Sequence, residues 1–481
     1  MKKVTLILLF VLLLNVFFAC ASKTEENNQQ TNVGANDPSS SETKPDFPEP
    51  DLPADANFNG AAFTILHPMW SLYNTYYFAE ENTGEVMNDA LYERTTAIED
   101  RLNIKIKTYC PGIITELPGA LSSVVLAGDP AYDLMLTHCR ENLLDFVRNQ
   151  YLVDWNIVPY IDMDKPYWNK TVKDNHTMYG ILLYNASDFV MPDTEVIFFN
   201  KGMITNYSLD VPYDLVNNGK WTWAKLKEMG LVVAEDLNGD GVNDIDDQFG
   251  FASLNSSYAN TNVLIAANIR PINKAADYTL SVNVEIDKLQ TLVSITQSIV
   301  DDKALAFCYP YSQATDPNIG NKPPIGIDSN RLLFEYVTLS LAQFYRTTEV
   351  EFGIIPIPKF DDKQENHSGL NTSGYMCIPQ SAGDLNLVGM VCELLAAENR
   401  RTVLPAFYDI ALGQKISRDV ESEKMLDIIF SNLKYDLTWA YSIDFFGIKS
   451  DGISSFIDSN MTRWETSLEN VMKYYREYTE G

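Results

Sequence analysis

Apolar and polar positions near the start of the folded region follow two different spacings. Residues 61–66 form an apolar run that predicts a strand. Met87, Leu91, Ile98 and Leu102 then recur at helical spacing with charged residues between them, which predicts an amphipathic helix. A strand followed by such a helix is the first half of an α/β unit.

The same order repeats directly downstream. Residues 103–107 alternate isoleucine with lysine, which predicts a half-buried strand. Residues 117–126 predict a helix, and the apolar residues at 133–137 predict a short strand. Successive units of this kind favour a mostly parallel sheet covered by helices.

A second run of strands and helices begins near Val190. Residues 196–199 predict a buried strand, and residues 221–233 predict a helix with Thr222 as its N-cap. Further helices are predicted at residues 287–301, 333–345, 385–399 and 421–431. Two α/β regions in one chain predict two lobes, and a crevice between lobes is a common place for a small ligand.

The N-terminal residues are typical of an exported protein. Lys2 and Lys3 precede an almost unbroken apolar run at residues 4–18, which is short for a spanning helix of about 20 residues. The break at Cys20 resembles a bacterial lipobox, with Phe17 where leucine is usual. We therefore expect residues 1–20 to be a lipoprotein signal peptide that ends in lipidation of Cys20. An uncleaved anchor and an ordinary secreted protein are the alternatives.

Residues 21–57 are rich in Ser, Asn, Thr, Glu, Asp and Pro and have few large apolar side chains. Such a segment cannot bury enough surface to offset its ordering entropy, which predicts a disordered tether. Each buried acyl methylene contributes roughly 0.8 kcal/mol, so several chains on Cys20 would hold the protein at the extracytoplasmic face of the cell membrane.

Composition narrows the class of partner. Hydrophobic residues make up 46% of the 481 residues, which is enough to bury a large core. The formal net charge of −29 argues against nucleic acid, because phosphate contacts need clustered Lys and Arg. Apart from Cys20, the cysteines are widely spaced and contain no CxxC pair, so zinc is not expected. They are free thiols or include one disulfide.

One local motif matches the twelve-residue calcium loop, with Gly241 at position six, where the chain must turn sharply. The expected ligands are Asp236, Asn238, Asp240, the Val242 carbonyl, Asp244 and Asp247. Asp247 stands where Glu is usual. Phe249 and Phe251 follow and predict a strand, so the loop is not half of a paired calcium sensor. A structural calcium ion is the prediction, and a solvated Asx-rich turn that binds nothing tightly is the alternative.

Motifs of known catalytic centres are missing from the sequence. The histidines are isolated, and no HExxH, GxSxG, GxGxxG or P-loop motif occurs. With 65 acidic residues, a carboxylate pair for glycoside hydrolysis could always be proposed, so that pattern has little specificity. We therefore expect no enzymatic activity.

Aromatic residues are abundant, with 26 Tyr, 23 Phe and 7 Trp. Sugar rings present flat C–H faces that pack on aromatic faces, while their hydroxyls need polar partners. The candidate ligand-binding aromatics have polar neighbours and are Trp70, Tyr73, Tyr76, Trp168 and Trp439. Trp70 leads because it follows the first predicted strand, where ligands bind in α/β folds. Core packing is the alternative for every one of them.

Several stretches occur in a characteristic order along the chain. They are residues 84–90 with 93–94, 128–134, 199–201, 219–223, 236–241 leading into 247–250, and 352–359. Together they resemble the extracellular solute-binding protein family 1, the carbohydrate-binding lipoproteins of ABC importers. The resemblance spans nearly the whole mature chain and is strongest to the longer members with a calcium-type loop.

The resemblance implies an α/β fold of the type II periplasmic-binding-protein kind, with two lobes, a hinge and an interlobe cleft. Lobe one would comprise residues 58–190 plus 357–415, and lobe two residues 191–356 plus 416–481. The chain would cross between the lobes near residues 188–195, 353–359 and 414–418.

Family members often place an acidic side chain at the crevice just before the Phe-Asn-Lys strand. Asp193 and Glu195 occupy that stretch here. A carboxylate can accept hydrogen bonds from two sugar hydroxyls, so we expect these residues to contact the ligand. Hydrogen bonding within the hinge region is the alternative.

The implied function is that of an ABC importer's substrate-binding lipoprotein, a monomer that captures a sugar or oligosaccharide by hinge closure. Its partners would be the small carbohydrate, the importer's permease subunits and the membrane, reached through the lipid anchor. A secreted carbohydrate-active enzyme and a surface glycan-binding module are the alternatives.

Overall fold

The computed structural model describes residues 48–69, 77–138, 143–186, 194–254, 261–310, 324–345, 348–412, 420–443, 445 and 447–480. The chain divides into two units, Met1–Asp46 and Phe47–Gly481. The predicted signal peptide, Cys20 and most of the predicted tether lie outside the described residues. Within the described ranges, no helix combines the length and the apolar character needed to cross a membrane.

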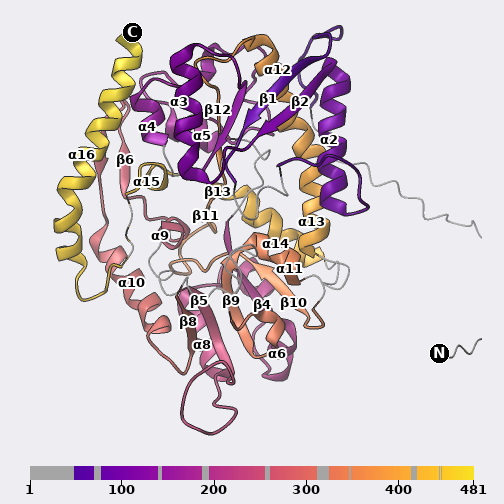
Figure 1. Ribbon diagram of the computed structural model, residues 1–481. Coiled ribbons are helices and arrows are strands. Elements are labelled where there is room, and N and C mark those ends of the chain that lie inside the picture. Colours follow the sequence, from indigo (N-terminus) through magenta and orange to yellow (C-terminus); the bar gives the residue numbers. More distant parts are fainter. Residues whose placement is uncertain are drawn as a thin grey trace, which may run out of the picture. The chain divides into compact units, whose positions relative to one another are not determined.

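The first sheet has the strand order β12-β3-β1-β2. Figure 1 labels β12, β1 and β2 of this sheet. β1 (Ala61–Leu66) lies inside the sheet and pairs in parallel with β2 (Ile104–Tyr109) and β3 (Leu134–Thr137). β12 (Tyr375–Cys377) joins β3 in the antiparallel direction. The predicted strands are confirmed, and β12 shows that a distant segment returns to complete this sheet.

The two helices predicted between these strands are also present. α2 (Val86–Leu102) ends at Asn103, which has a left-handed φ of 49°. α3 (Leu117–Ala127) ends at Gly128, with a φ of 64°. The predicted apolar face of α2 is buried and consists of Met87, Leu91, Ile98 and Leu102.

The second sheet has the strand order β10-β4-β9-β5-β8 (Figure 1). Its strands are β4 (Glu195–Asn200), β5 (Phe249–Leu254), β8 (Ala306–Tyr309), β9 (Leu332–Thr338) and β10 (Phe352–Ile355). β5 pairs in parallel with β8 and β9, whereas β4 is antiparallel to both β9 and β10. The strands predicted at residues 196–199 and after the calcium-type loop are therefore confirmed.

The helix predicted at residues 333–345 is wrong over most of its length. These residues form β9, a 3-10 turn at Leu339–Leu341 and the short α11 (Ala342–Tyr345). β9 lies between β4 and β5, and its first six residues are all buried. A strand covered on both faces loses the alternation of polar residues, so its pattern cannot be distinguished from that of a buried helix.

α8 (Trp223–Val233) packs on β5 and begins where the sequence predicts. The Oγ1 atom of Thr222 accepts a hydrogen bond from the backbone N–H of Lys225 at 3.3 Å, which satisfies one free donor of the first turn. The helix and the strand approach through two glycines, because a Cβ built on Gly250 would lie only 2.4 Å from the Cα of Gly230.

The remaining elements are mostly helical. The helices are α4 (Leu143–Arg148), α5 (Lys170–His176), α6 (Lys201–Asn206), α7 (Pro212–Asn217), α9 (Thr261–Ala266), α10 (Ile286–Val300), α12 (Leu385–Glu398), α13 (Leu404–Leu412), α14 (Val420–Ser431), α15 (Leu437–Ala440) and α16 (Ile453–Glu480). The short strands are β6 (Ile272–Lys274), β7 (Leu280–Val282), β11 (Gly369–Leu370) and β13 (Leu433–Lys434). α10, α12 and α14 confirm the helices predicted at 287–301, 385–399 and 421–431.

Segments that are far apart in the sequence meet where the chain passes between the two sheets. The chain leaves the second sheet after Ile355 and enters the first sheet at Tyr375, with β11 on the way. β11 pairs in parallel with β13, where Gly369 lies opposite Leu433. Thr194, just before β4, lines the same small hollow as Gly369 and Leu433. The crossing predicted at residues 414–418 lies outside the described residues, and no crossing was predicted at β13.

The C-terminal segment contacts elements on both sides of this passage. The Tyr435 N–H donates to Oγ1 of Thr171 on α5 at 3.0 Å, and the Tyr441 and Tyr184 hydroxyls are 2.8 Å apart. α16 packs on α4, which precedes the passage at Thr194, and on α10, which follows it. The predicted boundaries assign all of residues 416–481 to lobe two. These contacts do not decide between the two lobes, so the boundaries stay a prediction.

We predict that Gly250→Ala lowers the free energy of unfolding by about 3 kcal/mol, because a methyl group at this position must push the backbones of α8 and β5 apart. Gly119→Ala is the control. Gly119 is in α3 and has no atom within 4 Å of a built Cβ, so alanine should stabilise the helix slightly. Chemical denaturation of both variants measures the difference. Equal stability of the two would contradict the close approach.

Candidate ligand-binding site

The carboxyl ends of parallel strands in the two sheets define two edges. In the first sheet, β1 and β3 end at Leu66 and Thr137. In the second sheet, β5, β8 and β9 end at Leu254, Tyr309 and Thr338. We call these the first and second ligand-side edges, because ligands of α/β folds bind beyond the carboxyl ends of parallel strands.

The passages between the sheets start and end at these same edges. Tyr375, where the chain enters the first sheet, pairs with Thr137 at the end of β3. Glu195, where β4 begins, pairs with Thr338 at the end of β9. The two ligand-side edges therefore lie toward the connecting segments and toward each other.

Glu195 is positioned on the second ligand-side edge. Its carboxylate accepts a hydrogen bond from the Tyr336 hydroxyl of the neighbouring strand, and its side chain is half-buried. It also lines the small hollow formed by Thr194, Gly369 and Leu433, beside the passages between the sheets. The carboxylate is thus held in place from within its own sheet.

Trp439 is positioned on the first ligand-side edge. It belongs to α15, is partly buried, and its ring is 6.2 Å from that of His138 in an edge-on arrangement. His138 directly follows β3, so the indole lies beside the carboxyl end of that strand. α15 begins at Asp436, whose side chain accepts a hydrogen bond from the Thr438 N–H at 2.9 Å. This cap fixes the start of the helix that carries Trp439.

The structure places Trp168 in the core. Only 4% of the residue is exposed, and its indole N–H donates to Oε2 of Glu393 at 2.8 Å. The Tyr167 hydroxyl donates to Oε1 of the same carboxylate at 2.6 Å. Burial raises the pKa of Glu393, while these donors lower it. Trp168 therefore satisfies a buried carboxylate of α12 in this structure and is not brought together with Glu195 or Trp439.

The other predicted ligand-binding residues, Trp70, Tyr73, Tyr76 and Asp193, lie outside the described residues. Their role in binding therefore stays a prediction. Two described residues, His67 and Thr194, are close to these residues in sequence. His67 directly follows β1 and is buried, and Thr194 precedes β4. In sequence, both of these stretches thus adjoin a ligand-side edge.

A polar cavity of about 360 Å³ lies between α5, β6 and the segment from β13 to α15. Its walls come from three distant parts of the chain, and its lining residues are Thr171, Asp174, Asn175, Arg270, Ile272, Lys274, Lys434, Asp436 and Leu437. The sequence contains no local motif that marks these residues. Their basic members stand out only because the chain as a whole is so acidic.

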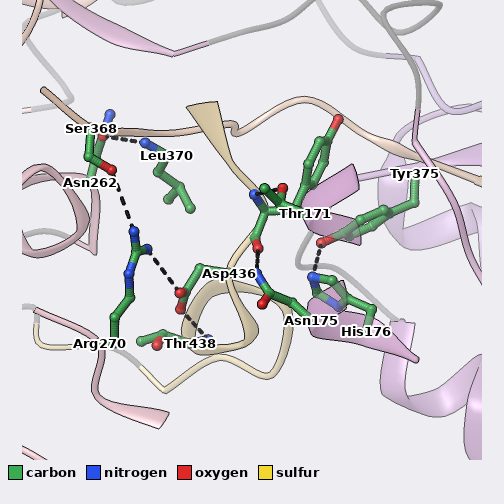
Figure 2. A network of polar contacts seen from close by, with 11 residues as sticks. Thr171, Asn175, His176, Asn262, Arg270, Ser368, Leu370, Tyr375, Asp436 and Thr438 are labelled. Atoms are coloured by element: carbon green, nitrogen blue, oxygen red, sulfur yellow. Dashed lines mark hydrogen bonds and ion pairs between the residues drawn. The ribbon is translucent and has the colours of Figure 1, made fainter. Parts of the chain in front are cut away.

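Figure 2 shows the polar contacts that join these walls. The Arg270 guanidinium forms an ion pair with Asp436 at 3.1 Å and approaches the Ser368 hydroxyl at 3.5 Å. On the opposite side, the Asn175 side-chain amide donates to the Tyr435 carbonyl at 2.7 Å. Because β13 runs directly into Tyr435 and Asp436, the connecting segment is bonded on one side to α5 and on the other to Arg270.

His176, the last residue of α5, is buried beside the same network (Figure 2). Its Nδ1 lies 3.0 Å from the Tyr184 hydroxyl and its Nε2 lies 3.3 Å from the Tyr375 hydroxyl. Burial first, and the nearby Lys274 second, lower the pKa of His176 to about 3. The imidazole is therefore neutral at physiological pH, and it joins α5 to the first strand residue after the passage.

The calcium-type loop at residues 236–247 is closed by hydrogen bonds from backbone N–H groups to its own carboxylates. The carboxylate of Asp236 accepts hydrogen bonds from the Gly239 and Gly241 N–H groups at 2.7 and 2.9 Å. Asp247 is buried and closes the loop by accepting from the Leu237 and Asp244 N–H groups, both at 3.0 Å.

Gly241 has the left-handed φ of 75° that the turn at position six requires. The carboxylate oxygens of the loop are the kind of ligand that a hard cation such as calcium prefers. Among the described residues, however, no group of three or more His, Cys, Asp or Glu side chains is arranged to hold a metal ion. The calcium ion therefore stays a prediction.

Comparison with solved structures identifies the fold. A sugar transporter from Rhizobium etli in an open conformation matches 86% of this chain and 99% of its own, with a TM-score of 0.51 and 11% identity. An ABC substrate-binding protein from Listeria monocytogenes in complex with cycloalternan matches 88% and 99%, with a TM-score of 0.49 and 12% identity. An ABC transporter associated binding protein from B. animalis subsp. lactis in complex with β-1,6-galactobiose matches 87% and 97%, at 0.49 and 11%.

No protein-family model and no curated protein sequence matches the chain. At identities this low, the likeness defines the fold alone. The chain has the two-lobed, periplasmic-binding-protein-like α/β fold, as the resemblance found in the sequence implied.

The buried His176 predicts a loss of stability in acid. Its pKa is about 3 in the folded state and about 6.5 in the unfolded state, so the unfolded chain binds more protons between these values. The free energy of unfolding therefore falls as the pH drops below 6.5. By pH 5 this residue alone removes about 2 kcal/mol.

His176→Gln, which cannot titrate, should lose about 2 kcal/mol less than the parent between pH 7.5 and pH 5. Urea denaturation at both pH values provides the measurement, and the data at pH 7.5 separate the packing cost of the substitution from its pH dependence. An unchanged pH dependence would mean that His176 is not held neutral by burial.

Proposed function

We propose that this chain is the substrate-binding lipoprotein of an ABC importer and that it captures a sugar or oligosaccharide between its two lobes. The observation that supports this most strongly is the pair of ligand-side edges: Glu195 begins β4 of the second sheet, Trp439 lies beside the end of β3 of the first sheet, and both edges adjoin the connecting segments. The fold is the one found in a sugar transporter protein, which adds support.

Binding would use both kinds of group that a sugar needs. The indole of Trp439 offers an apolar face for the C–H side of a ring, and the Glu195 carboxylate, already oriented by Tyr336, accepts hydrogen bonds from hydroxyls. Closure of the lobes would then bring the two sides together around the ligand. The proposed lobes are residues 58–190 plus 357–415 and residues 191–356 plus 416–481, and Trp439 of the last segment lies against the first sheet, beside His138.

The proposed location follows from the N-terminal sequence. Lipidation of Cys20 would anchor a monomer at the extracytoplasmic face of the cell membrane, with residues 21–57 as tether. The closed protein would deliver its sugar to the permease subunits of the importer. It would not alter the ligand, because the sequence carries no catalytic motif.

Calcium is proposed as a structural ion of the 236–247 loop. The loop already has the sharp turn at Gly241 and supplies carboxylates at alternate positions. Exchange of the present N–H contacts of Asp236 and Asp240 for metal contacts would tie the loop that precedes β5. The ion would stabilise that loop and take no part in sugar binding.

The sugar-binding proposal predicts that a glycan panel contains a ligand that quenches or enhances tryptophan fluorescence without being converted. Trp439→Ala should weaken its binding about tenfold, since one stacked ring is removed. Trp168→Phe is the matched control, because it should lower stability through the loss of the bond to Glu393 and leave affinity unchanged. Formation of a product from any glycan would favour the enzyme alternative instead.

The calcium proposal predicts that millimolar calcium raises the melting temperature by about 2 °C or more relative to chelator, since an ion that binds only the folded state stabilises it. Asp236→Asn combined with Asp240→Asn should abolish the rise. Asp246→Asn should retain it, because Asp246 is not at a ligand position of the loop. A rise that persists in the double variant would assign the effect to another site.

A further inference from the structure

The cavity between α5, β6 and α15 collects positive charge in a chain whose formal net charge is −29. Arg270, Lys274 and Lys434 all line it. They come from the segment after α9, from β6 and from β13, and none of them is fully exposed. Three cationic side chains that converge on one cavity are costly unless anions compensate them.

Two of the three cations have partners within the protein. The Arg270 guanidinium is paired with the Asp436 carboxylate at 3.1 Å. The Lys274 ammonium donates to the carbonyls of Asp174, Asn175 and Thr177 at 2.5, 2.9 and 3.1 Å. These carbonyls satisfy the donors of Lys274 at the C-terminal end of α5 but do not neutralise its full charge.

Lys434 is the cation that stays uncompensated. Within the described part of the chain, no hydrogen bond, ion pair or ring contact engages its ammonium. Leu433, its neighbour in β13, is buried, so alternation along the strand turns Lys434 to the opposite face, toward the cavity. Burial lowers the pKa of Lys434, and the nearby Arg270 lowers it further.

We propose that this cavity binds the carboxylate of an acidic saccharide, a uronic acid unit, with the Lys434 ammonium as its principal partner. The inference rests on the proposed function, since it assigns a charge class to the captured sugar and places one of its units in this cavity, whose lining residue Leu437 belongs to the same helix as Trp439. The volume of about 360 Å³ accommodates one sugar unit, and the side chains of Thr171 and Asn175 offer hydroxyl partners beside the cation.

The charge balance favours a monoanion over a dianion. The lining holds three cations and two carboxylates, those of Asp174 and Asp436, so its formal charge is +1. A carboxylate neutralises this charge. A phosphate dianion would leave an excess negative charge beside Asp436, which is only 8% exposed.

Isothermal titration of the purified full chain tests the proposal with two matched pairs of probes. Digalacturonate is compared with galactobiose of the same linkage, and cellobiouronate with cellobiose, so that the members differ in the carboxylates at C6, two in the first pair and one in the second. We expect the acidic member of at least one pair to bind about tenfold more tightly, with an affinity that falls as salt is raised.

Lys434→Gln should remove that preference and leave the affinity for the neutral member within about twofold, whereas Lys434→Arg should largely restore it. Lys424→Gln is the control, because Lys424 pairs with Glu421 on the exposed side of α14. Lys434→Gln should also keep or slightly raise the melting temperature, since it relieves repulsion with Arg270, so loss of binding is not loss of folding.

Each other result overturns the inference in a defined way. If neutral probes bind as tightly as acidic ones, the proposed sugar-binding function stands and the acidic specificity fails. If uronates do not bind at millimolar concentration, or Lys434→Gln has no effect on them, the cavity is not their site. If inorganic phosphate binds in a Lys434-dependent way and uronates do not, the assignment to a carboxylate is wrong.

Discussion

The structure depends on the short segments that lie side by side where the chain passes between its two sheets. Thr194, β11 and β13 lie together, and the pairing of Gly369 with Leu433 fixes two of them in register. Because these segments join the sheets at the carboxyl ends of their parallel strands, the two ligand-side edges lie toward each other. Several adjacent connections also restrict how the sheets can move, and a bending motion about them would change the gap between the edges while keeping each sheet intact.

Hydrogen bonds and an ion pair hold the segment after β13 in place. Tyr435 is held by Thr171 and Asn175 on α5, and Asp436 is held by Arg270, so the segment is bonded on both sides within a few residues. The neutral His176 lies behind it. Buried polar contacts of this kind specify one arrangement, because a changed position would leave donors or carboxylates without partners. Asp436 pairs with Arg270 and backbone carbonyls accept from Lys274, so within the described part of the chain Lys434 is the cavity's cation without a protein partner.

Much of the fold could be predicted from the sequence, since local patterns decide it. The first strands, α2, α8 with its Thr222 cap, and the helices α10, α12 and α14 follow from periodicity and capping. β9 could not be predicted, because a strand covered on both faces has the same apolar pattern as a buried helix. The role of Trp168 depends on Glu393, which is 225 residues away, and no local signal reveals such a contact. For the same reason the cavity could not be predicted, because its cations come from three distant segments.

We propose that the two lobes close around a saccharide and leave it unaltered. Small-angle X-ray scattering of the purified chain, measured with and without a glycan that alters its tryptophan fluorescence, tests this most directly. We expect the radius of gyration to fall on binding, and we expect the glycan to be recovered unchanged from the same sample. A radius of gyration that stays constant at saturation, or a glycan that is recovered cleaved, would contradict the account.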